Sequence, residues 1–579
     1  MLYFHPLVLH PTHTLYAPYS DHLAEHLPAK MFLNREWRAT GELPLWNPYH
    51  FCGAPFVHDI QVGMFYPPNL VVLLVPGTGV GAATSWVIAL HVLAAGLFAL
   101  LYAKSHGLNE PAALVAAVGF MLSSKWMTHL LLAGHTVTAG LAWLPLLLFL
   151  AERAIRRGDV RSVVWVGCAL ALLGLGTHPQ WALYAGAFAV AWTFPRERPL
   201  RWAGCWLGGA LVASLLCAVQ LFPTWEAAQW SARSGGIDGS GALSVGLHTA
   251  LNLLGPALSN SPPHAWEMQG VFGVYWLAAA CAAPLVVARH EGRVRWQFGV
   301  LCGLFVFALG GAALLDWLPG FDLFRVPTRM LLIASFPLAF LAGRTTHALT
   351  ESGWALEARS GLSRGFRRVV LFLGVPTILG LWFTDGRVWW AFVAYWAAAV
   401  LALPLFIRVL QNNVAGRRTR TALWLAILLV DLVAPVAVLP AVKPQAELYP
   451  SSPILERIKE HPRPVRALDW DVNEQGAPSS FLGIGAPQAL VHSVGTPRGY
   501  NPLDVRHYRE FLAFVVNDDR PLRGNSPYTQ QVVPNFEVGN PRLFELLRVT
   551  HFVAPANAPR PPGGWREVRT DPAPPAVAP

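Results

Sequence analysis

The chain has 579 residues, of which 54% are hydrophobic and 13% are charged, and its mean hydropathy is +0.40. A soluble domain carries about 25% charged residues, so this composition excludes an ordinary soluble protein and predicts helices that face lipid. The formal net charge of +10 does not indicate nucleic-acid binding. The lysines and arginines lie in short clusters between apolar runs, which is a pattern of membrane topology.

The apolar runs predict the membrane spans, because a span requires roughly 20 apolar residues. Residues 1–9 resemble the last two turns of a membrane helix, and we expect the native start codon to lie upstream of Met1. Together with this partial segment, the later runs predict an α-helical polytopic bundle of about 12–13 spans. We place these later spans at 80–103, 110–123, 135–151, 161–176, 181–194, 203–222, 271–288, 296–314, 329–345, 369–383, 388–407 and 421–440.

The basic residues predict the orientation of the bundle. The loops of one side hold 20 lysines and arginines, and the longer loops of the other side hold eight. Since cytoplasmic loops carry the excess of basic residues, the first set is expected to be cytoplasmic. The outer side then receives loop 10–79, the turn 178–180, loop 223–270, loop 315–328 and everything after about residue 441.

The part after residue 440 differs in composition from the predicted membrane domain 1–440. Residues 441–555 are more polar and rich in proline, and we expect a small extracytoplasmic α/β or mixed domain. Alternating runs at Ala489–Val494 and Val549–Ala554 predict short strands. Residues 556–579 are dominated by proline, alanine and glycine, which is typical of a disordered tail.

The loop 10–79 contains two carboxylates next to predicted spans, Asp21 and Asp59. An ionised carboxylate near hydrocarbon is costly unless it is solvated, paired or used. Either residue can accept a proton from an acceptor hydroxyl, or bind a divalent cation such as Mg²⁺ or Mn²⁺. The structural alternative is that each aspartate caps a helix at the membrane interface, with Ser20 and Asp21 preceding His22–Trp37.

Further polar residues are expected on the outer side. His178 and Gln180 lie where two spans meet, and they either bind a ligand or satisfy backbone groups at the junction. Outer-face arginines run against the usual bias, and guanidinium groups match phosphate oxygens with paired hydrogen bonds. The alternative is that these arginines form salt bridges with Asp322 or Glu226. The candidate residues are the arginines Arg233, Arg325 and Arg329 and the acid Glu226.

Several short motifs are spread over nearly the whole chain. The most specific lies in the first loop, where GELPLWNP at Gly41–Pro48 precedes Gly53-Ala54-Pro55. The other stretches are Gln61, Phe65–Asn69, His178–Gln180, Gln220–Pro223 with Glu226, Ser231 and Arg233, Phe324–Arg329, Gly499–Pro502 and Leu546–Val549. Together these motifs resemble the YfhO-type family of bacterial membrane proteins.

That family resembles the GT-C glycosyltransferases, which use polyprenyl-phosphate sugars on the outer membrane face. The resemblance implies a multi-pass protein of the bacterial inner membrane that transfers a sugar to an envelope glycan, lipid or protein. In GT-C enzymes an acid of the first outer loop is catalytic, and by position it maps onto Asp21, with Asp59 as a second acid. His58, Gln61, His178, Gln180 and Glu226 would then contact substrate, and Arg233, Arg325 and Arg329 would hold the departing phosphate.

Two other functions stay open from the sequence. A transporter or flippase of lipid-linked envelope precursors predicts internal repeats and polar groups near the midplane. The chain shows no clear repeat, and only Asp431 and His91 stand out at depth. A non-catalytic scaffold for envelope assembly would keep the same motifs. Asp431 either has a function or is hydrogen-bonded within the bundle.

Overall fold

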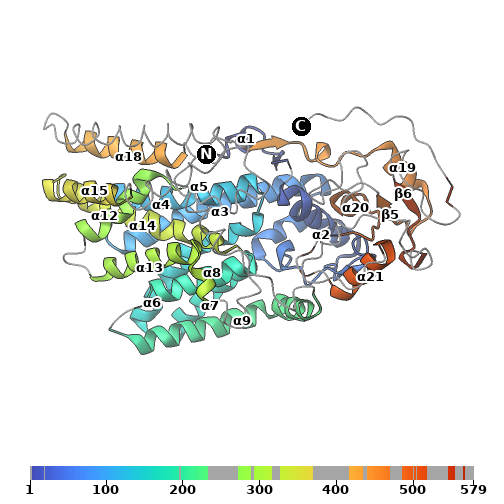
Figure 1. Ribbon diagram of the computed structural model, residues 1–579, viewed down its shortest axis with the longest axis horizontal. Coiled ribbons are helices and arrows are strands. Elements are labelled where there is room, and N and C mark those ends of the chain that lie inside the picture. The colour runs from blue at the N-terminus through green and yellow to red at the C-terminus, as the bar shows by residue number, and fades with distance from the viewer. Residues whose placement is uncertain are drawn as a thin grey trace. The chain divides into compact units, whose positions relative to one another are not determined.

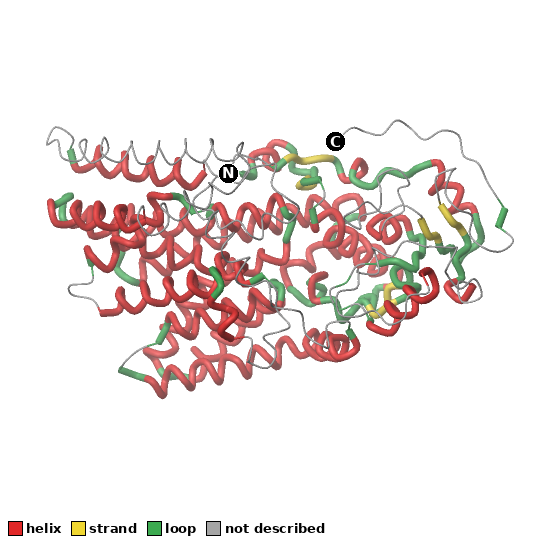
Figure 2. The backbone as a smooth tube through the Cα atoms, in the orientation of Figure 1, coloured by secondary structure: helices red, strands yellow, loops and turns green. Residues whose placement is uncertain are grey.

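Helices make up most of the described part of the chain, and the strands are short (Figure 2). By backbone contacts the chain divides into two compact units, and each is described by itself. Unit 1 comprises Met1–Val87, Ala218–Ile237 and Ala441–Pro579, and unit 2 comprises Ile88–Cys217 and Asp238–Pro440. The computed structural model describes residues 3–18, 20–194, 197–231, 272–287, 292–315, 326–369, 416–433, 440–469, 486–499, 501, 503, 505–517, 545–553 and 565–566.

Within its described residues, the regular elements of unit 2 are all helices (Figure 1). At its centre lies α14 (Met330–Glu351), which is buried along almost its whole length and packs against α4, α12 and α13. The other helices are α3 (Val80–Ser105, which begins in unit 1), α4 (Glu110–Met121), α5 (Ser124–Met127), α6 (Leu144–Arg157), α7 (Val160–Leu175), α8 (Pro179–Trp192), α9 (Pro199–Trp230, which ends in unit 1), α12 (Val274–Val286), α13 (Gly292–Ala308), α15 (Leu356–Val369) and α18 (Arg417–Val433).

The predicted fold class, an α-helical membrane protein with a small mixed C-terminal part, is confirmed. Four helical stretches of the described residues are long and apolar enough to cross a membrane: Gly77–Ser105, Glu110–Leu132, Thr136–Arg157 and Pro199–Trp230. Every other predicted span within the described residues overlaps a helix, whereas 388–407 and all of 369–383 except Val369 lie outside them. The loop expected at 223–270 begins later than predicted, because α9 continues to Trp230.

The span predicted at 110–123 is longer than expected. A polar triplet, Ser123-Ser124-Lys125, ends the apolar run in the sequence, but the helical path continues through α5 and the π-helix Thr128–Leu132. Tertiary contacts bury the triplet: Ser123 Oγ donates to Ser335 Oγ over 2.8 Å, and Lys125 is 1% exposed. Hydropathy alone places the end of this span at the polar triplet. The helical stretch continues past it, because these polar side chains are buried inside the bundle.

Asp431, on α18, is hydrogen-bonded within the bundle. Its carboxylate accepts three backbone N–H groups at the start of α12, from Val274 (3.1 Å), Tyr275 (2.7 Å) and Trp276 (3.2 Å). A carboxylate at a helix N-terminus satisfies free N–H groups and faces the positive end of the helix dipole. The neighbouring Gly273 permits this approach, because a Cβ there would lie 2.2 Å from Asp431. Hydrogen bonding within the bundle, which was the alternative to a functional role, therefore accounts for Asp431.

Unit 1 joins the first loop to the tail of the chain. The strand β1 (Thr14–Tyr16) pairs antiparallel with β4 (Ala441–Lys443). In the tail, β5 (Ala467–Asp469) pairs parallel with β6 (His551–Val553), beside the helices α19 (Pro453–Glu460), α20 (Ala486–His492) and α21 (Arg506–Asn517). The first loop adds α1 (His5–Leu9), the π-helix η1 (His22–His26), α2 (Leu27–Thr40), the hairpin β2 (Trp46–Asn47) with β3 (Ala54–Pro55), and the 3-10 helices η2 (Ile60–Val62), η3 (Pro67–Leu73) and η4 (Gly77–Gly79).

The helix expected at His22–Trp37 is present as η1 and α2. Its apolar residues Leu27, Phe32 and Leu33 are buried in a core that also includes Leu490 of α20. The helix α2 ends at Gly41, whose φ of +73° is the left-handed conformation that glycine favours after a helix. The apolar face of α2 thus connects the first loop to the tail.

Two expectations for the tail have different outcomes. The strand expected at Val549–Ala554 is present as β6, but the strand expected at Ala489–Val494 is wrong, because α20 covers Ala486–His492. Arg35 of α2 donates to the carbonyls of Leu490 and Val491 over 3.1 Å each. These carbonyls belong to the last turn of α20, where helices lack internal donors, so packing on α2 favours the helix.

The compact units are made of other segments than the expected domains 1–440 and 441–555. Unit 2 ends at Pro440, and loop 10–79 belongs to the same unit as the tail. Of the stretch 556–579, only Trp565 and Arg566 lie within the described residues.

Candidate functional site

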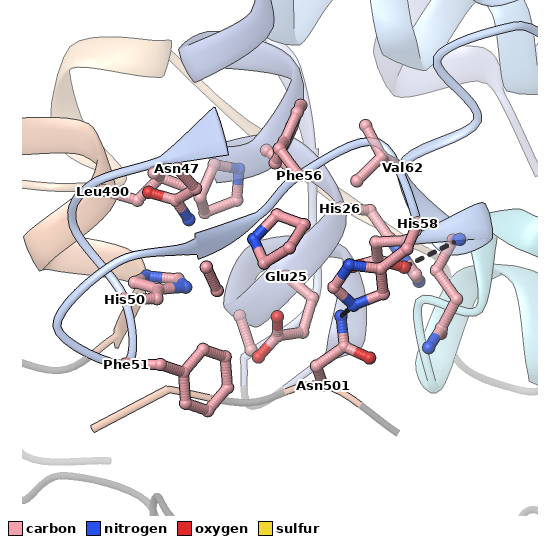
Figure 3. Close-up of a pocket in the computed structure, with 17 residues that line it drawn as sticks. Glu25, His26, Asn47, His50, Phe51, Phe56, His58, Val62, Leu490 and Asn501 are labelled. Carbon is pink, nitrogen blue, oxygen red and sulfur yellow. Dashed lines mark hydrogen bonds between the residues drawn. The ribbon is translucent and has the colours of Figure 1, made fainter. Parts of the chain in front are cut away.

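A small cavity of about 50 Å³ lies in unit 1 between the first loop and the tail (Figure 3). Its wall comes from η1 and α2, from the segment 47–62, and from two tail residues, Leu490 and Asn501. The polar lining residues are Glu25, His26, Asn47, His50, His58, Asp59, Gln61 and Asn501. Three residues predicted from the sequence, His58, Asp59 and Gln61, are therefore brought to one cavity.

Asp59 combines a structural and a chemical property. Its Oδ1 accepts the backbone N–H of Gln61 over 2.9 Å, so Asp59 caps the short helix η2, as the structural alternative predicts. Burial of the carboxylate raises its pKa from 3.8 to about 6, while the Gln61 hydrogen bond acts in the opposite direction. A carboxyl group with this pKa can hold or release a proton near neutral pH.

Glu25 is a second carboxylate of the cavity, and it is not among the residues predicted from the sequence. It lies on η1, four residues after Asp21, and its side chain stands in the middle of the view in Figure 3. Asp21 itself occupies the N-cap of η1 without a side-chain cap bond and is not among the cavity-lining residues. Residues four apart share a helix face, and this spacing was the signal that would have pointed to Glu25. The catalytic role of Asp21 stays a prediction.

His58 is held from two sides. Its Nε2 lies 3.3 Å from Nδ2 of Asn501, and burial lowers the pKa of its imidazole, so the ring is neutral at pH 7. The backbone carbonyl of His58 accepts the hydroxyl of Thr224 over 2.8 Å, and the carbonyl of Val57 accepts Nε2 of Gln220 over 3.0 Å. Gln220 belongs to a motif that carries the family resemblance, and it positions the loop next to the cavity.

A backbone clamp joins the first-loop motif to the tail motif. Phe51 N donates to the carbonyl of Arg498 over 3.0 Å, and Cys52 N donates to that of Thr496 over 3.1 Å. Phe51 and Cys52 have φ values of 56° and 60°, which side chains other than glycine adopt rarely. A Cβ on Gly499 would lie 2.6 Å from the Phe51 ring. Close approach and local strain thus coincide beside the cavity, as is common at functional sites.

Three basic side chains of η1 and α2 are buried at four-residue spacing: His22, His26 and Lys30. Burial lowers the pKa of Lys30 to about 8, and it lowers the pKa of His22 to about 3 with help from the charges of Lys30 and His26. Lys30 therefore keeps its positive charge near pH 7, whereas His22 is neutral. Hydropathy did not reveal these residues, because they are polar positions on the buried face of an amphipathic helix.

A separate polar cluster lies in unit 2 and contains three further predicted residues. Gln180 is 1% exposed; its Oε1 accepts from Arg329 Nη1 over 2.9 Å and its Nε2 donates to the Tyr184 hydroxyl over 3.0 Å. His178 caps α8, with its Nδ1 accepting the N–H of Gln180 over 3.3 Å, which satisfies a backbone group as the structural alternative predicts. The guanidinium carbon of Arg329 lies 5.0 Å from the ring centre of Trp181. Gln180 and Arg329 are thus brought together.

Two buried histidines, missed in the sequence, complete this cluster. The Nδ1 atoms of His129 and His135 lie 3.0 Å apart, and both rings contact Trp181, at centroid distances of 5.8 and 5.7 Å. His129 lies on the π-helix Thr128–Leu132, and such insertions are frequent at functional sites. The local signal was weak, because His129 lies between two predicted spans and His135 is the first residue of one of them.

The remaining predicted residues are Glu226, Arg233 and Arg325. Glu226 is exposed on α9 and is not a lining residue of the cavity. Arg233 and Arg325 lie outside the described residues, so their expected contacts with phosphate stay predictions. Within the described ranges, no group of three or more His, Cys, Asp or Glu side chains is arranged to hold a metal ion.

No family model matches the chain, and no curated protein sequence matches it. Among solved structures, it is similar to the arabinofuranosyltransferase AftD from Mycobacteria, with 16% identity and a TM-score of 0.44 over 88% of this chain and 34% of AftD. It is also similar to the oligosaccharyltransferase AglB from Archaeoglobus fulgidus, solved with an inhibitory peptide and a dolichol-phosphate. There the identity is 12% and the TM-score 0.45, over 93% of this chain and 66% of AglB. The chain thus spans about a third of AftD and just under two thirds of AglB, and TM-scores below 0.5 do not identify it with either enzyme.

Proposed function

We propose that the chain is an inverting membrane glycosyltransferase, which transfers a sugar from a polyprenyl-phosphate donor to an envelope acceptor on the outer face. The observation that carries the proposal is the cavity in unit 1, where Glu25 and Asp59 lie beside the neutral imidazole of His58. The resemblance of the first-loop motif to the YfhO-type family supports the same reaction class.

In this reaction an acceptor hydroxyl attacks the anomeric carbon of the donor while the bond to the phosphate oxygen breaks. The hydroxyl loses a proton to a general base, and the polyprenyl phosphate leaves with the electron pair of the broken bond. Asp59 suits the base, because with a pKa of about 6 it is mostly ionised at pH 7 yet remains more basic than an ordinary aspartate. Asp21 is the alternative base that the resemblance implies.

The size of the cavity limits what it receives. A volume of about 50 Å³ corresponds to one or two water molecules at about 30 Å³ each. We therefore propose that it takes the reacting hydroxyl of the acceptor rather than a whole sugar ring. His58, held by Asn501, positions this group next to Asp59.

Arg329 is proposed separately as an anchor for an anionic phosphate. Its guanidinium carries two fixed contacts, the hydrogen bond to Gln180 and the stacking over Trp181. Such a preorganised fork suits phosphate oxygens.

The test is a transfer assay with the purified full chain and radiolabelled sugars on polyprenyl-phosphate donors. We expect label to move to an envelope acceptor, and Asp59→Asn to abolish transfer while expression and thermal stability are kept. Asp21→Asn, in parallel, distinguishes the two candidate bases, since only the variant of the true base loses transfer. Unchanged rates in both variants would refute both assignments, and a folded protein that transfers no sugar from any such donor would favour a scaffold.

A further inference from the structure

The turn between α6 and α7 forms a tight helical hairpin in unit 2. The helix α6 ends at Arg157, Gly158 follows with φ +73°, and Asp159 caps α7 by accepting the N–H of Ser162 over 2.9 Å. Only two residues connect the helices, so the last turn of α6 lies beside the first turn of α7. This geometry brings together arginines that precede and follow the turn.

A groove of about 330 Å³ lies at this end of the hairpin. At about 30 Å³ per water, it has room for about ten water molecules, which suits a polar headgroup better than a single small ion. Its lining is chemically mixed, because three residues are cationic and two are apolar or aromatic. The lining residues are Leu150, Arg153, Arg157, Arg161, Ser162 and Trp165.

The three arginines present a concentrated positive charge. Arg153 and Arg157 lie four residues apart on one helix, a spacing at which like charges repel, and all three arginines are exposed. The nearest acids have other partners: Glu152 is buried and pairs with Arg156 and Arg293. Asp159 accepts both the N–H and the hydroxyl of Ser162, and it also lies near Arg157. None of the lining residues is acidic, so an external anion would relieve the repulsion.

The apolar part of the groove points to a lipid. Trp165 is half-exposed and follows Arg161 by one helical turn, and Leu150 lies one turn before Arg153. Tryptophan favours the level of the lipid headgroups. The excess of basic residues predicts that this turn faces the cytoplasm, where the leaflet is rich in anionic lipid and basic pockets between helices bind headgroups.

We propose that this groove binds the phosphodiester headgroup of an anionic phospholipid from the cytoplasmic leaflet. Arg153, Arg157 and Arg161 hold the phosphate oxygens with paired hydrogen bonds. Leu150 and Trp165 contact the glycerol and the first methylene groups of the acyl chains. The site does not depend on the proposed sugar transfer, since it lies on the side that is predicted to be cytoplasmic.

The test is native mass spectrometry of the full chain with phosphatidylglycerol and with phosphatidylcholine of identical acyl chains. We expect the wild type to retain phosphatidylglycerol preferentially. In the variant R153Q/R157Q/R161Q, we expect this preference to fall roughly 100-fold, or roughly fivefold for each arginine removed. The single variant R161Q, in which one exposed side chain changes, keeps the test valid if the triple variant does not fold.

The matched control is R364Q/R367Q/R368Q, which removes three exposed arginines from α15 of the same unit without touching the groove. It should keep the preference. Equal loss in both triple variants would show a general charge effect and overturn the site, as would an unchanged preference in R153Q/R157Q/R161Q. Displacement of the lipid by millimolar inorganic phosphate or glycerol phosphate would assign the groove to a soluble phosphate compound instead.

Discussion

The imidazole Nε2 of His58 and the amide Nδ2 of Asn501 lie 3.3 Å apart, although 443 residues separate them in the chain. His58 belongs to the first loop, and Asn501 belongs to the tail motif Gly499–Pro502. Both side chains are buried, so their contact is one of the links that shape the wall of the cavity. The tail therefore contributes directly to the candidate site.

Replacing Asn501 by Ala should destabilise unit 1. The change leaves Nε2 of a buried histidine without its amide partner, which costs about 1–3 kcal/mol. A double-mutant cycle with His58→Ala, followed by thermal unfolding, should give a coupling energy of about 0.5–1.5 kcal/mol. Purely additive effects would show that the two side chains do not interact.

The rate of transfer should depend on pH through Asp59. With a pKa of about 6, Asp59 loses its charge as the pH falls below 6, so a reaction that needs the carboxylate should have an acidic limb with a midpoint near pH 6. Asp59→Asn should reduce the rate by about 10²–10⁴-fold at pH 7. A profile that is flat between pH 5 and 7 would exclude Asp59 as the base.

Stability gives an independent check on the same pKa. The folded pKa of Asp59 is above its ordinary value of 3.8, so the folded state binds more protons between pH 4 and pH 6. The contribution of Asp59 to the unfolding free energy therefore falls as the pH rises through this window. Asn cannot ionise, and it can still cap η2. The melting temperature of Asp59→Asn relative to wild type should therefore increase from pH 4 to pH 6 and stay constant above it.

Glu25 should matter for transfer more than other acids of unit 1. Glu25→Gln keeps the size of a cavity side chain but removes its charge, and we expect at least a roughly tenfold loss of kcat/KM, which corresponds to about 1.4 kcal/mol. The matched control is Glu447→Gln, an exposed acid of the same unit that does not line the cavity. If both variants lose activity equally, Glu25 has no special role.

Gly499→Ala should disturb the clamp between the tail and the first loop. The added Cβ would lie 2.6 Å from the Phe51 ring, and that ring must move. Overpacking of this kind costs about 1–3 kcal/mol, measured as a lower melting temperature. Gly204→Ala, in the helix α9 with open space around it, should instead be neutral or stabilising by about 0.5–1 kcal/mol. Equal effects at both glycines would contradict the close contact.

Arg329→Lys tests the cluster around Trp181. Lysine keeps the positive charge but loses the planar stacking over the indole ring and the forked donor geometry. We expect a loss of stability of about 1–2 kcal/mol and, if Arg329 anchors phosphate, a higher KM for the donor. Arg367→Lys, an exposed arginine on α15, should change stability by less than about 0.5 kcal/mol.

The sequence by itself determined that the chain is a helical membrane protein. Hydropathy is a sum of residue properties over a local window, and runs such as 80–103 and 203–222 need no tertiary information to indicate a span. The helix after Asp21 and the cap formed by Asp59 were also local patterns. These features could be predicted because their causes lie within a few residues of each other.

Tertiary structure alone decided the rest. The short apolar run at Ala489–Val494 is compatible with a strand or a helix, and packing on α2 together with Arg35 favours α20. Burial of Lys125, and the meeting of Glu25 with His58 and Asn501 at one cavity, depend on residues far apart in the chain. Burial and desolvation are properties of the folded surroundings, so the raised pKa of Asp59 could not be read from its neighbours in sequence.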